Sequence, residues 1–383
     1  MTVTAARPVT FTYREITLQD RLREVAREVG GKPALVLGDR TLTYRELDER
    51  TDRLAGALAR RGVKPGDRVT LFMPNSLEFV VAFYGALKAG GVVNPINALS
   101  KEREVRFQVA DAGAAAVMYH EALAPIVDAV RAELGGVRTF AVTGASAPAG
   151  VERFDDLVAE PGTVSVRTAM SDLAALPYTS GTTGFPKGVM LTHANLTANQ
   201  QQFFAAVPVS RDDVFLNVLP YFHIYALNLL MAGAVSLGAT QVVMPRFDLV
   251  EYLTLAERHR ATACFIVPPI VLGLAMHPEV DKHDLSSVRF FFSGAAPGEA
   301  PREADHPGLR SHRDLPGDAR QSHGRADPRV DRSCDRGDRG PDRRPRDRDE
   351  DARDRRGRRD LRARTAGHAR VLEQAGGHRR RHP

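Results

Sequence analysis

The chain has 383 residues, 43% of them hydrophobic and 26% charged, so it can bury a large core and form more than one domain. Its two cysteines, Cys264 and Cys334, offer neither a disulfide framework nor a metal-binding spacing, which suits a reducing compartment. No apolar run is long enough to cross a membrane, and the first residues lack a signal-peptide pattern. We therefore expect a cytoplasmic globular protein with no transmembrane segment.

The net charge of +6 is unevenly distributed along the chain. Residues 299–383 hold 24 of the 53 basic residues and 17 of the 47 acidic ones, which gives that segment a net charge of +7 and leaves −1 for the rest. An argument for nucleic-acid binding from the overall basicity would therefore concern only the last residues. For the body of the chain we expect no nucleic-acid partner.

Helix and strand patterns alternate along the body. The Gly38-Asp39 dipeptide predicts a hairpin turn, and Thr43 with Glu46 forms the capping-box pattern that begins a helix. Alternation of this kind favours an α/β fold with parallel sheets covered by helices. The predicted helices are 18–29, 44–61, 77–89, 102–110, 121–134, 194–205, 249–259 and 268–276. The predicted strands are 34–37, 40–43, 69–73, 92–95, 115–119, 139–142, 173–177, 189–191, 212–220, 241–244, 264–267 and 289–292.

A loop rich in glycine and hydroxyl groups lies between the predicted strands 173–177 and 189–191. Backbone amides freed by glycine can converge on phosphate oxygens, hydroxyl groups add donors, and a lysine adds a mobile charge. The spacing is not that of a Walker A motif, because Pro186 directly precedes the lysine. The alternative is a solvated linker, which has no need of an ordered Pro-Lys-Gly before a strand. The candidate phosphate contacts are Thr179, Ser180, Gly181, Thr182, Thr183, Gly184 and Lys187.

The string Tyr178-Thr-Ser-Gly-Thr-Thr-Gly-Phe-Pro-Lys-Gly-Val resembles the phosphate-binding signature of the adenylate-forming superfamily of CoA ligases, luciferases and peptide-synthetase adenylation domains. The strings Leu42-Thr-Tyr-Arg-Glu-Leu and Pro74-Asn-Ser resemble the opening of the same family. The resemblance implies a large N-terminal domain of stacked, mostly parallel sheets with covering helices. It also implies ATP, Mg²⁺, CoA and a small carboxylic acid as reaction partners.

A second resemblance concerns the segment Leu-Pro-Tyr-Phe-His-Ile-Tyr-Ala-Leu-Asn, which begins at Leu219. It is similar to the acyl-substrate motif of 4-coumarate–CoA ligases and fatty-acyl-CoA ligases, which favours the CoA-ligase branch over the others. The resemblance implies that His223 contacts the acyl carboxylate and that Tyr225 lines the acyl pocket. Leu229 stands where those ligases carry a polar pocket residue, which suggests a more apolar acyl group. A core histidine is the structural alternative for His223.

Two further positions carry roles by resemblance. Arg246 occupies the place of a CoA-contacting cation in similar ligases, although an isolated surface arginine is the simpler interpretation. The turn Ser293-Gly-Ala-Ala-Pro follows a predicted buried strand, where small residues let backbone approach a ligand closely. In the family this turn contacts adenine. Gly294, Ala295 and Ala296 are therefore the expected adenine contacts, and an ordinary strand-to-helix turn is the alternative.

The composition changes abruptly after Gly298, since the remaining residues include no Lys, Phe, Tyr, Ile, Met or Asn. Such a segment cannot bury enough apolar surface to offset its ordering entropy. We expect residues 1–297 to form a partial AMP-binding domain and residues 298–383 to form a disordered, Arg/Asp-rich tail. The C-terminal lid domain and the metal-binding residues of the family are absent from this sequence.

Back-translation offers an origin for the tail. Residues 307–318 can be encoded by codons that, read one nucleotide later, give Gln-Gly-Tyr-Gly-Leu-Thr-Glu-Thr-Ser-Pro-Val. This string resembles the next family motif, which holds ATP and magnesium, and residues 329–340 and 355–374 yield later family motifs in the same way. We infer a frameshift between Pro297 and Pro307, natural or artefactual.

The sequence thus predicts an ATP-dependent, AMP-forming acyl-CoA ligase of the fatty-acid or 4-coumarate type, with His223 and Lys187 as catalytic residues. This particular chain is expected to be truncated and inactive. The alternatives are a non-catalytic nucleotide or acyl binder and an RNA-binding protein acting through its arginine-rich tail. Steep salt dependence of RNA affinity would distinguish the last of these.

Overall fold

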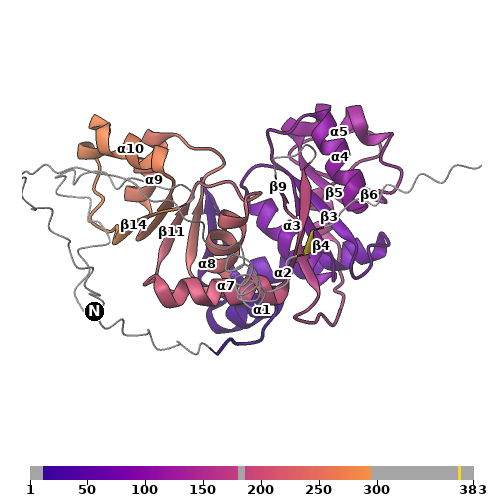
Figure 1. Cartoon of the computed structure of the whole chain (residues 1–383), viewed down its shortest axis with the longest axis horizontal. Helices are drawn as coiled ribbons and strands as arrows, with labels where there is room; N and C mark the ends of the chain where they lie inside the picture. The colour runs from indigo at the N-terminus through magenta and orange to yellow at the C-terminus, as the bar shows by residue number, and fades with distance from the viewer. Residues whose placement is uncertain (1–11, 180–185, 295–369, 372–383) are drawn as a thin grey trace, which may run out of the picture. The chain divides into compact units, whose positions relative to one another are not determined.

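The computed structural model describes residues 12–179, 186–294 and 370–371, which belong to one compact unit (Figure 1). Two mixed sheets with covering helices make up this part of the chain, as the sequence predicts. Within the described residues, no helix combines the length and apolar character needed to span a membrane. Residues Ser180, Gly181, Thr182, Thr183, Gly184, Ala295 and Ala296 lie outside the described residues.

The larger sheet has the strand order β15-β10-β8-β4-β3-β5-β6-β7, with β9 paired to β10. Strands from β8 through β4 and β3 to β7 are parallel, whereas β10 is antiparallel to β8, β9 and β15. Its strands are β3 (Arg68–Phe72), β4 (Val92–Pro95), β5 (Ala114–His120), β6 (Thr139–Thr143), β7 (Glu152–Arg153), β8 (Leu173–Ala175), β9 (Tyr178–Thr179), β10 (Lys187–Thr192) and β15 (Arg370–Val371).

The smaller sheet has the strand order β14-β13-β11-β12-β1-β2 and is parallel except for the β1–β2 hairpin. Gly38 in the turn of that hairpin has a positive φ of 59°, as its glycine predicts. The strands are β1 (Pro33–Leu37), β2 (Arg40–Thr43), β11 (Val214–Asn217), β12 (Thr240–Val243), β13 (Ala263–Ile266) and β14 (Phe290–Ser293).

The helices follow the predicted pattern with local differences. The capping box of Thr43 and Glu46 begins α2 as expected. The predicted helix 121–134 divides into a 3-10 turn and α5, because Pro125 lacks the amide needed to continue a preceding turn. The helices are α1 (Leu18–Val29), α2 (Tyr44–Arg60), α3 (Leu77–Lys88), α4 (Glu102–Ala112), η1 (Glu121–Leu123), α5 (Ala124–Arg131), α6 (Phe154–Ala159), α7 (His193–Ala206), η2 (Tyr225–Ala232), α8 (Gly233–Leu237), α9 (Leu249–Arg258), α10 (Pro268–Met276) and η3 (Pro278–Lys282).

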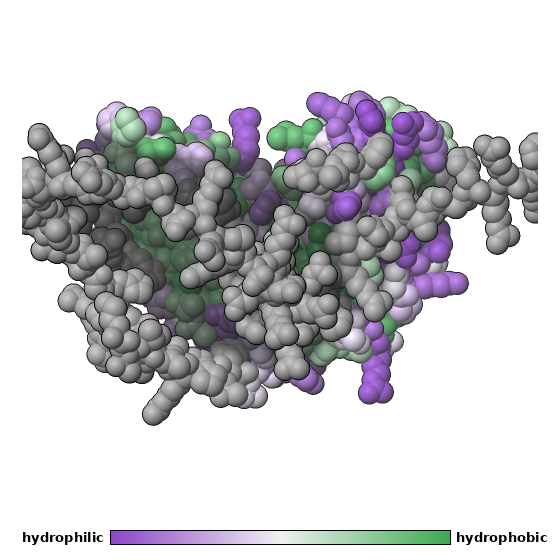
Figure 2. All heavy atoms as spheres, viewed as in Figure 1, coloured by the Kyte–Doolittle hydropathy of each residue, from purple (hydrophilic) through white to green (hydrophobic). Residues whose placement is uncertain are grey.

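Helix α3 lies in the main hydrophobic core, which contains residues of both sheets. Nearly every residue of α3 is buried, as expected for a helix that is apolar on all sides. Its last residue, Lys88, is also buried and forms ion pairs with Asp48 (2.5 Å) and Asp52 (2.8 Å) of α2. By contrast, α4 and α5 are amphipathic, and their outer surfaces are mainly hydrophilic in Figure 2.

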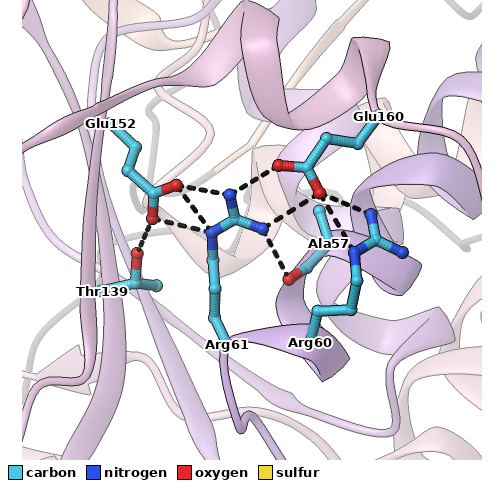
Figure 3. A network of polar contacts seen from close by, with 6 residues as sticks. All are labelled: Ala57, Arg60, Arg61, Thr139, Glu152 and Glu160. Atoms are coloured by element: carbon cyan, nitrogen blue, oxygen red, sulfur yellow. Dashed lines mark hydrogen bonds and ion pairs between the residues drawn. The ribbon is translucent and has the colours of Figure 1, made fainter.

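A charged network joins the end of α2 to β7 and α6 (Figure 3). Arg61 donates from Nε to Glu152 Oε1 (2.7 Å) and from Nη2 to Glu160 Oε1 (2.6 Å). Thr139 also donates to Glu152, and Arg60 to Glu160. Hydrogen bonds from Arg61 and Arg60 lower the pKa of Glu160 to about 2, and those from Arg61 lower the pKa of Glu152. The network therefore holds α6 against α2 while both carboxylates are ionised.

We predict that Arg61→Met lowers the free energy of unfolding by about 2 kcal/mol at pH 7, because charge-assisted hydrogen bonds are lost. Since the carboxylate pKa values are depressed from 4.5 in the folded state, the stabilisation is complete above about pH 4.5 and disappears as the pH falls toward 2. Urea unfolding at pH 7 and pH 3 measures both effects. Arg53→Met, which removes an exposed pair on the same helix, should change stability by less than about 0.5 kcal/mol. Equal losses for the two variants would contradict this account.

Candidate functional site

The glycine-rich loop closes an antiparallel hairpin. Thr179 and Lys187 are register partners at the ends of β9 and β10, and Gly188 pairs with Tyr178 one step further from the loop. A Cβ at Gly188 would lie 3.1 Å from the Leu176 side chain and 3.3 Å from the Tyr178 ring, so a larger residue here would require these side chains to shift by a few tenths of an ångström. The hairpin thus brings the two described phosphate candidates, Thr179 and Lys187, to the base of one loop. Both of these residues are exposed.

A second contact fixes the base of this hairpin to α4. The Tyr178 hydroxyl donates to Asp111 Oδ2 at 2.6 Å, and its ring meets Phe107 edge-on with centroids 6.4 Å apart. Burial and the bond to Asp111 together raise the pKa of Tyr178 above its ordinary value, so the hydroxyl keeps its proton. This anchor was not predicted from the sequence, because Tyr178 and Asp111 are 67 residues apart and only the fold brings them together.

The remaining candidate residues lie at the carboxyl edge of the smaller sheet. His223 follows β11, Arg246 follows β12, and Gly294 directly follows β14. These strands are parallel, so their carboxyl ends share one edge. From β11 the chain passes to β12 on one side of it, and then crosses back to β13 on the other side, beyond which β14 lies. The direction in which successive strands are added therefore reverses next to β11. Such a reversal creates the crevice in which open α/β sheets bind ligands.

Tyr225 connects two of the predicted segments. A Cβ placed on Gly294 would lie 3.5 Å from Tyr225 Cζ, so the tyrosine ring faces the Gly294 backbone with room for about one side-chain atom between them. The Tyr225 hydroxyl is buried and has no hydrogen-bond partner among the described residues. Burial raises its pKa, which keeps the hydroxyl protonated as a potential donor. The acyl motif and Gly294, the described residue of the expected adenine turn, therefore lie close together at the carboxyl edge of the smaller sheet.

The segment after β11 has an unusual backbone. Tyr225 begins a π-helix that continues to Ala232, a conformation that is rare and often found at functional sites. The exposed His223 lies just before it and accepts a hydrogen bond from the Tyr225 amide at Nδ1 (3.3 Å). His223 is therefore not a core histidine. Nε2 is the ring nitrogen left for a ligand by this contact.

Leu229 and Arg246 occupy different environments. Leu229 is half-buried within the π-helix and packs against the main core. Arg246 is exposed beyond the end of β12, next to the exposed Phe247. Neither position by itself assigns a ligand. Across residues 12–179, 186–294 and 370–371, no group of three or more His, Cys, Asp or Glu side chains is arranged to hold a metal ion.

The anchor of the hairpin can be tested by removing a single oxygen. We predict that Tyr178→Phe lowers the free energy of unfolding by about 1 kcal/mol, because it deletes one hydrogen bond and leaves the ring packing intact. Tyr84→Phe is the matched control, since the buried Tyr84 hydroxyl has no partner among the described residues. Chemical denaturation of both variants gives the comparison. A loss with Tyr84→Phe as large as that with Tyr178→Phe would contradict the assigned anchor.

Comparisons with known proteins identify the family of the chain. The model of the AMP-binding enzyme family matches residues 22–304. 4-Coumarate–CoA ligase 5 of Oryza sativa subsp. japonica is 40% identical over 267 residues, which are 67% of this chain and 48% of the ligase. The chain therefore spans about half the length of the curated relatives that it matches.

Two solved structures have a similar fold. The anthranilate CoA ligase AuaEII in complex with anthranoyl-AMP has a TM-score of 0.71 at 25% identity, over 74% of this chain and 55% of that one. The N-terminal domain of FACL13 from Mycobacterium tuberculosis, in an inhibitor-bound structure, has a TM-score of 0.69 at 31% identity, over 74% and 71%. Sequence and fold together place the protein: the chain belongs to the AMP-binding enzyme family.

Proposed function

We propose that the chain is the N-terminal part of an ATP-dependent, AMP-forming ligase that joins a carboxylic acid to CoA. The observation that carries this proposal is the proximity of Tyr225 to Gly294 at the carboxyl edge of the smaller sheet. It supports a shared site for the acyl group and the adenosine. The hairpin that ends in Lys187 supplies the phosphate-binding element.

In the proposed reaction a carboxylate oxygen attacks the α-phosphorus of ATP, an acyl-adenylate forms and pyrophosphate leaves. The CoA thiol then attacks the acyl carbon and releases AMP. No protein nucleophile is needed, so the protein contributes positioning and charge stabilisation. We assign phosphate contacts to Lys187 and the hairpin loop, and contact with the acyl carboxylate to His223. We also assign CoA contact to Arg246 and adenine contact to the turn that begins at Gly294.

The acyl group is expected to be apolar. Tyr225 contributes an aromatic wall, and Leu229 adds an aliphatic side chain where related ligases have a polar residue. The relatives named above include a 4-coumarate–CoA ligase and an anthranilate CoA ligase, and a long-chain-fatty-acid-CoA ligase from Archaeoglobus fulgidus has a similar fold with a TM-score of 0.69. Both aryl and fatty acids therefore belong to the proposed substrate class. We assign no described residue to Mg²⁺.

We further propose that residues 298–383 are translated out of frame. The family match ends at residue 304, close to the point at which the composition changes. The chain would then lack the later family motifs and the lid domain. Because a single electrostatic donor contributes about 3 kcal/mol to catalysis, loss of several leaves no measurable turnover. A nucleotide or acyl binder without ligase activity is the second candidate function, and the proposed frameshift favours it for this chain.

Binding without turnover is the expected behaviour of the 383-residue chain. We predict that calorimetry detects binding of α,β-methylene-ATP, whereas an assay with ATP, CoA and a panel of aryl and fatty acids releases no pyrophosphate. Lys187→Ala should weaken the binding about tenfold or more, because a charge-assisted contact is lost. The control Lys64→Ala removes another exposed lysine and should leave the affinity unchanged. Pyrophosphate release by the wild-type chain would contradict the proposed inactivity.

The proposed frameshift is tested by the gene itself. Sequencing of independent genomic DNA across codons 295–310 should show a reading frame one nucleotide later that encodes Tyr-Gly-Leu-Thr-Glu and continues through the later motifs. The enzyme expressed from the restored frame should release pyrophosphate with one of the acids in the panel. Stop codons in that frame would remove the explanation of the tail and leave the binding prediction in place.

A further inference from the structure

The buried side-chain amide of Asn75, which follows β3 of the larger sheet, binds the two segments that follow β11 and β12 of the smaller sheet. Asn75 Nδ2 donates to the carbonyl oxygens of Leu219 (3.0 Å) and Met244 (3.2 Å), and Asn75 Oδ1 accepts from the Tyr221 amide (2.8 Å). Asn75 is only 4% exposed, so these bonds are shielded from water. Both donor hydrogens and the acceptor oxygen of one side chain are thus engaged by backbone groups of the other sheet.

The position of Asn75 is itself fixed from both sides. The chain reaches it from β3, and the next residue, Ser76, caps α3 by accepting a hydrogen bond from the Phe79 amide (3.0 Å). Helix α3 is buried along nearly its whole length and cannot shift without disturbing the main core. Asn75 therefore presents its amide from a rigid strand-to-helix turn.

The three hydrogen-bond partners of Asn75 lie at the start of two segments that carry proposed ligand contacts. Leu219 and Tyr221 belong to the turn after β11, and Tyr221 precedes His223 by two residues. Met244 ends the β12 region and precedes Arg246 by two residues. Tyr221 is buried and packs on Phe79 with ring centroids 5.5 Å apart, which adds an apolar contact to the same attachment.

We infer that Asn75 is a positioning residue. It fixes the position of the segment after β11, which we call the acyl arm, relative to the segment after β12, which we call the CoA arm. The assignment of ligands to the two arms rests on the proposed function, whereas the mechanical link rests on the three hydrogen bonds. Because one side chain holds hydrogen bonds to both arms, removal of its amide should increase the mobility of both arms at once. It touches neither substrate nor reacting atoms and acts through the segments that it holds.

Asn94 supplies a matched comparison within the same sheet. It is fully buried like Asn75, and its Nδ2 donates to Thr70 Oγ1 (3.1 Å) on the neighbouring strand β3. No hydrogen bond of its side chain reaches either arm among the described residues. Asn94→Ala therefore removes a buried amide of equal size while leaving both arms attached.

Hydrogen exchange of the full 383-residue chain tests the inference directly. In Asn75→Ala we expect the backbone amides of residues 221–227 and 244–247 to exchange about tenfold faster or more, with the rest of the larger sheet unchanged. Asn75→Asp keeps the acceptor for the Tyr221 amide but loses the donors, so the protection of Tyr221 should be retained while residues 244–247 exchange faster. Asn94→Ala should accelerate exchange in β3 and β4 only.

Binding of an acyl-sulfamoyl-adenosine, a stable mimic of an acyl-adenylate, supplies the second readout. We expect Asn75→Ala to weaken its binding about tenfold while α,β-methylene-ATP binding changes less than threefold, and Asn94→Ala to alter neither. Uniformly faster exchange, or arms unaffected in both Asn75 variants, would overturn the inference. Wild-type chain that fails to bind the mimic would refute the proposed function, and the exchange pattern would still decide the role of Asn75.

Discussion

Parallel pairing of β11 with β12 and β13 is the constraint on which the arrangement of the candidate site depends. It gathers the carboxyl ends of β11, β12 and β14 at one edge, although the segments that follow them are distant in sequence. The opposite edge is held by the buried carboxylate of Asp213, which accepts from Arg289 Nη2 (2.6 Å) and Thr262 Oγ1 (2.6 Å). Asp213, Thr262 and Arg289 immediately precede β11, β13 and β14, so the hydrogen bonds and the ion pair of one buried carboxylate help to fix the relative register of the three strands.

Signals that act within a few residues made much of the fold predictable. The capping box at Thr43 and the turn at Gly38 involve neighbours in the chain, and the alternation of helices and strands identified the parallel sheets. Elements without such signals were missed. Strand β9 has only two residues, and α6 is a short helix without a side-chain cap. The π-helix after His223 has an apolar sequence that favours an ordinary helix equally well.

For the candidate site, the sequence predicted the residues to consider but not the contacts that hold them in place. The motifs identified which residues to consider, and the fold brings two of them, at Tyr225 and Gly294, close together. The anchors of the site could not be predicted, because Asn75 and Asp111 bind partners more than 60 residues away. In the sequence, Pro74-Asn-Ser was identified only as a string that resembles the opening of the family. The residues around a turn do not indicate which distant backbone groups a side chain of that turn will bind.

The body also shows how part of a family domain can retain a core of its own. Helix α3 is buried with both sheets around it, and the ion pairs of Lys88 and Arg61 connect α2 to its neighbours. These contacts all fall before the point at which the family match ends. Under the proposed function, ligand binding would depend on this core, whereas turnover would require groups encoded in the proposed reading frame.

The most direct test of the account is a crystal structure of the chain with an acyl-sulfamoyl-adenosine. The account predicts that the mimic lies at the carboxyl ends of β11 and β13, with its acyl group against Tyr225, its adenine at the turn after β14 and its sulfamoyl group facing the hairpin that ends in Lys187. A mimic bound elsewhere on the chain, or a crevice in which Tyr225 and Gly294 make no contact with it, would contradict the central claim.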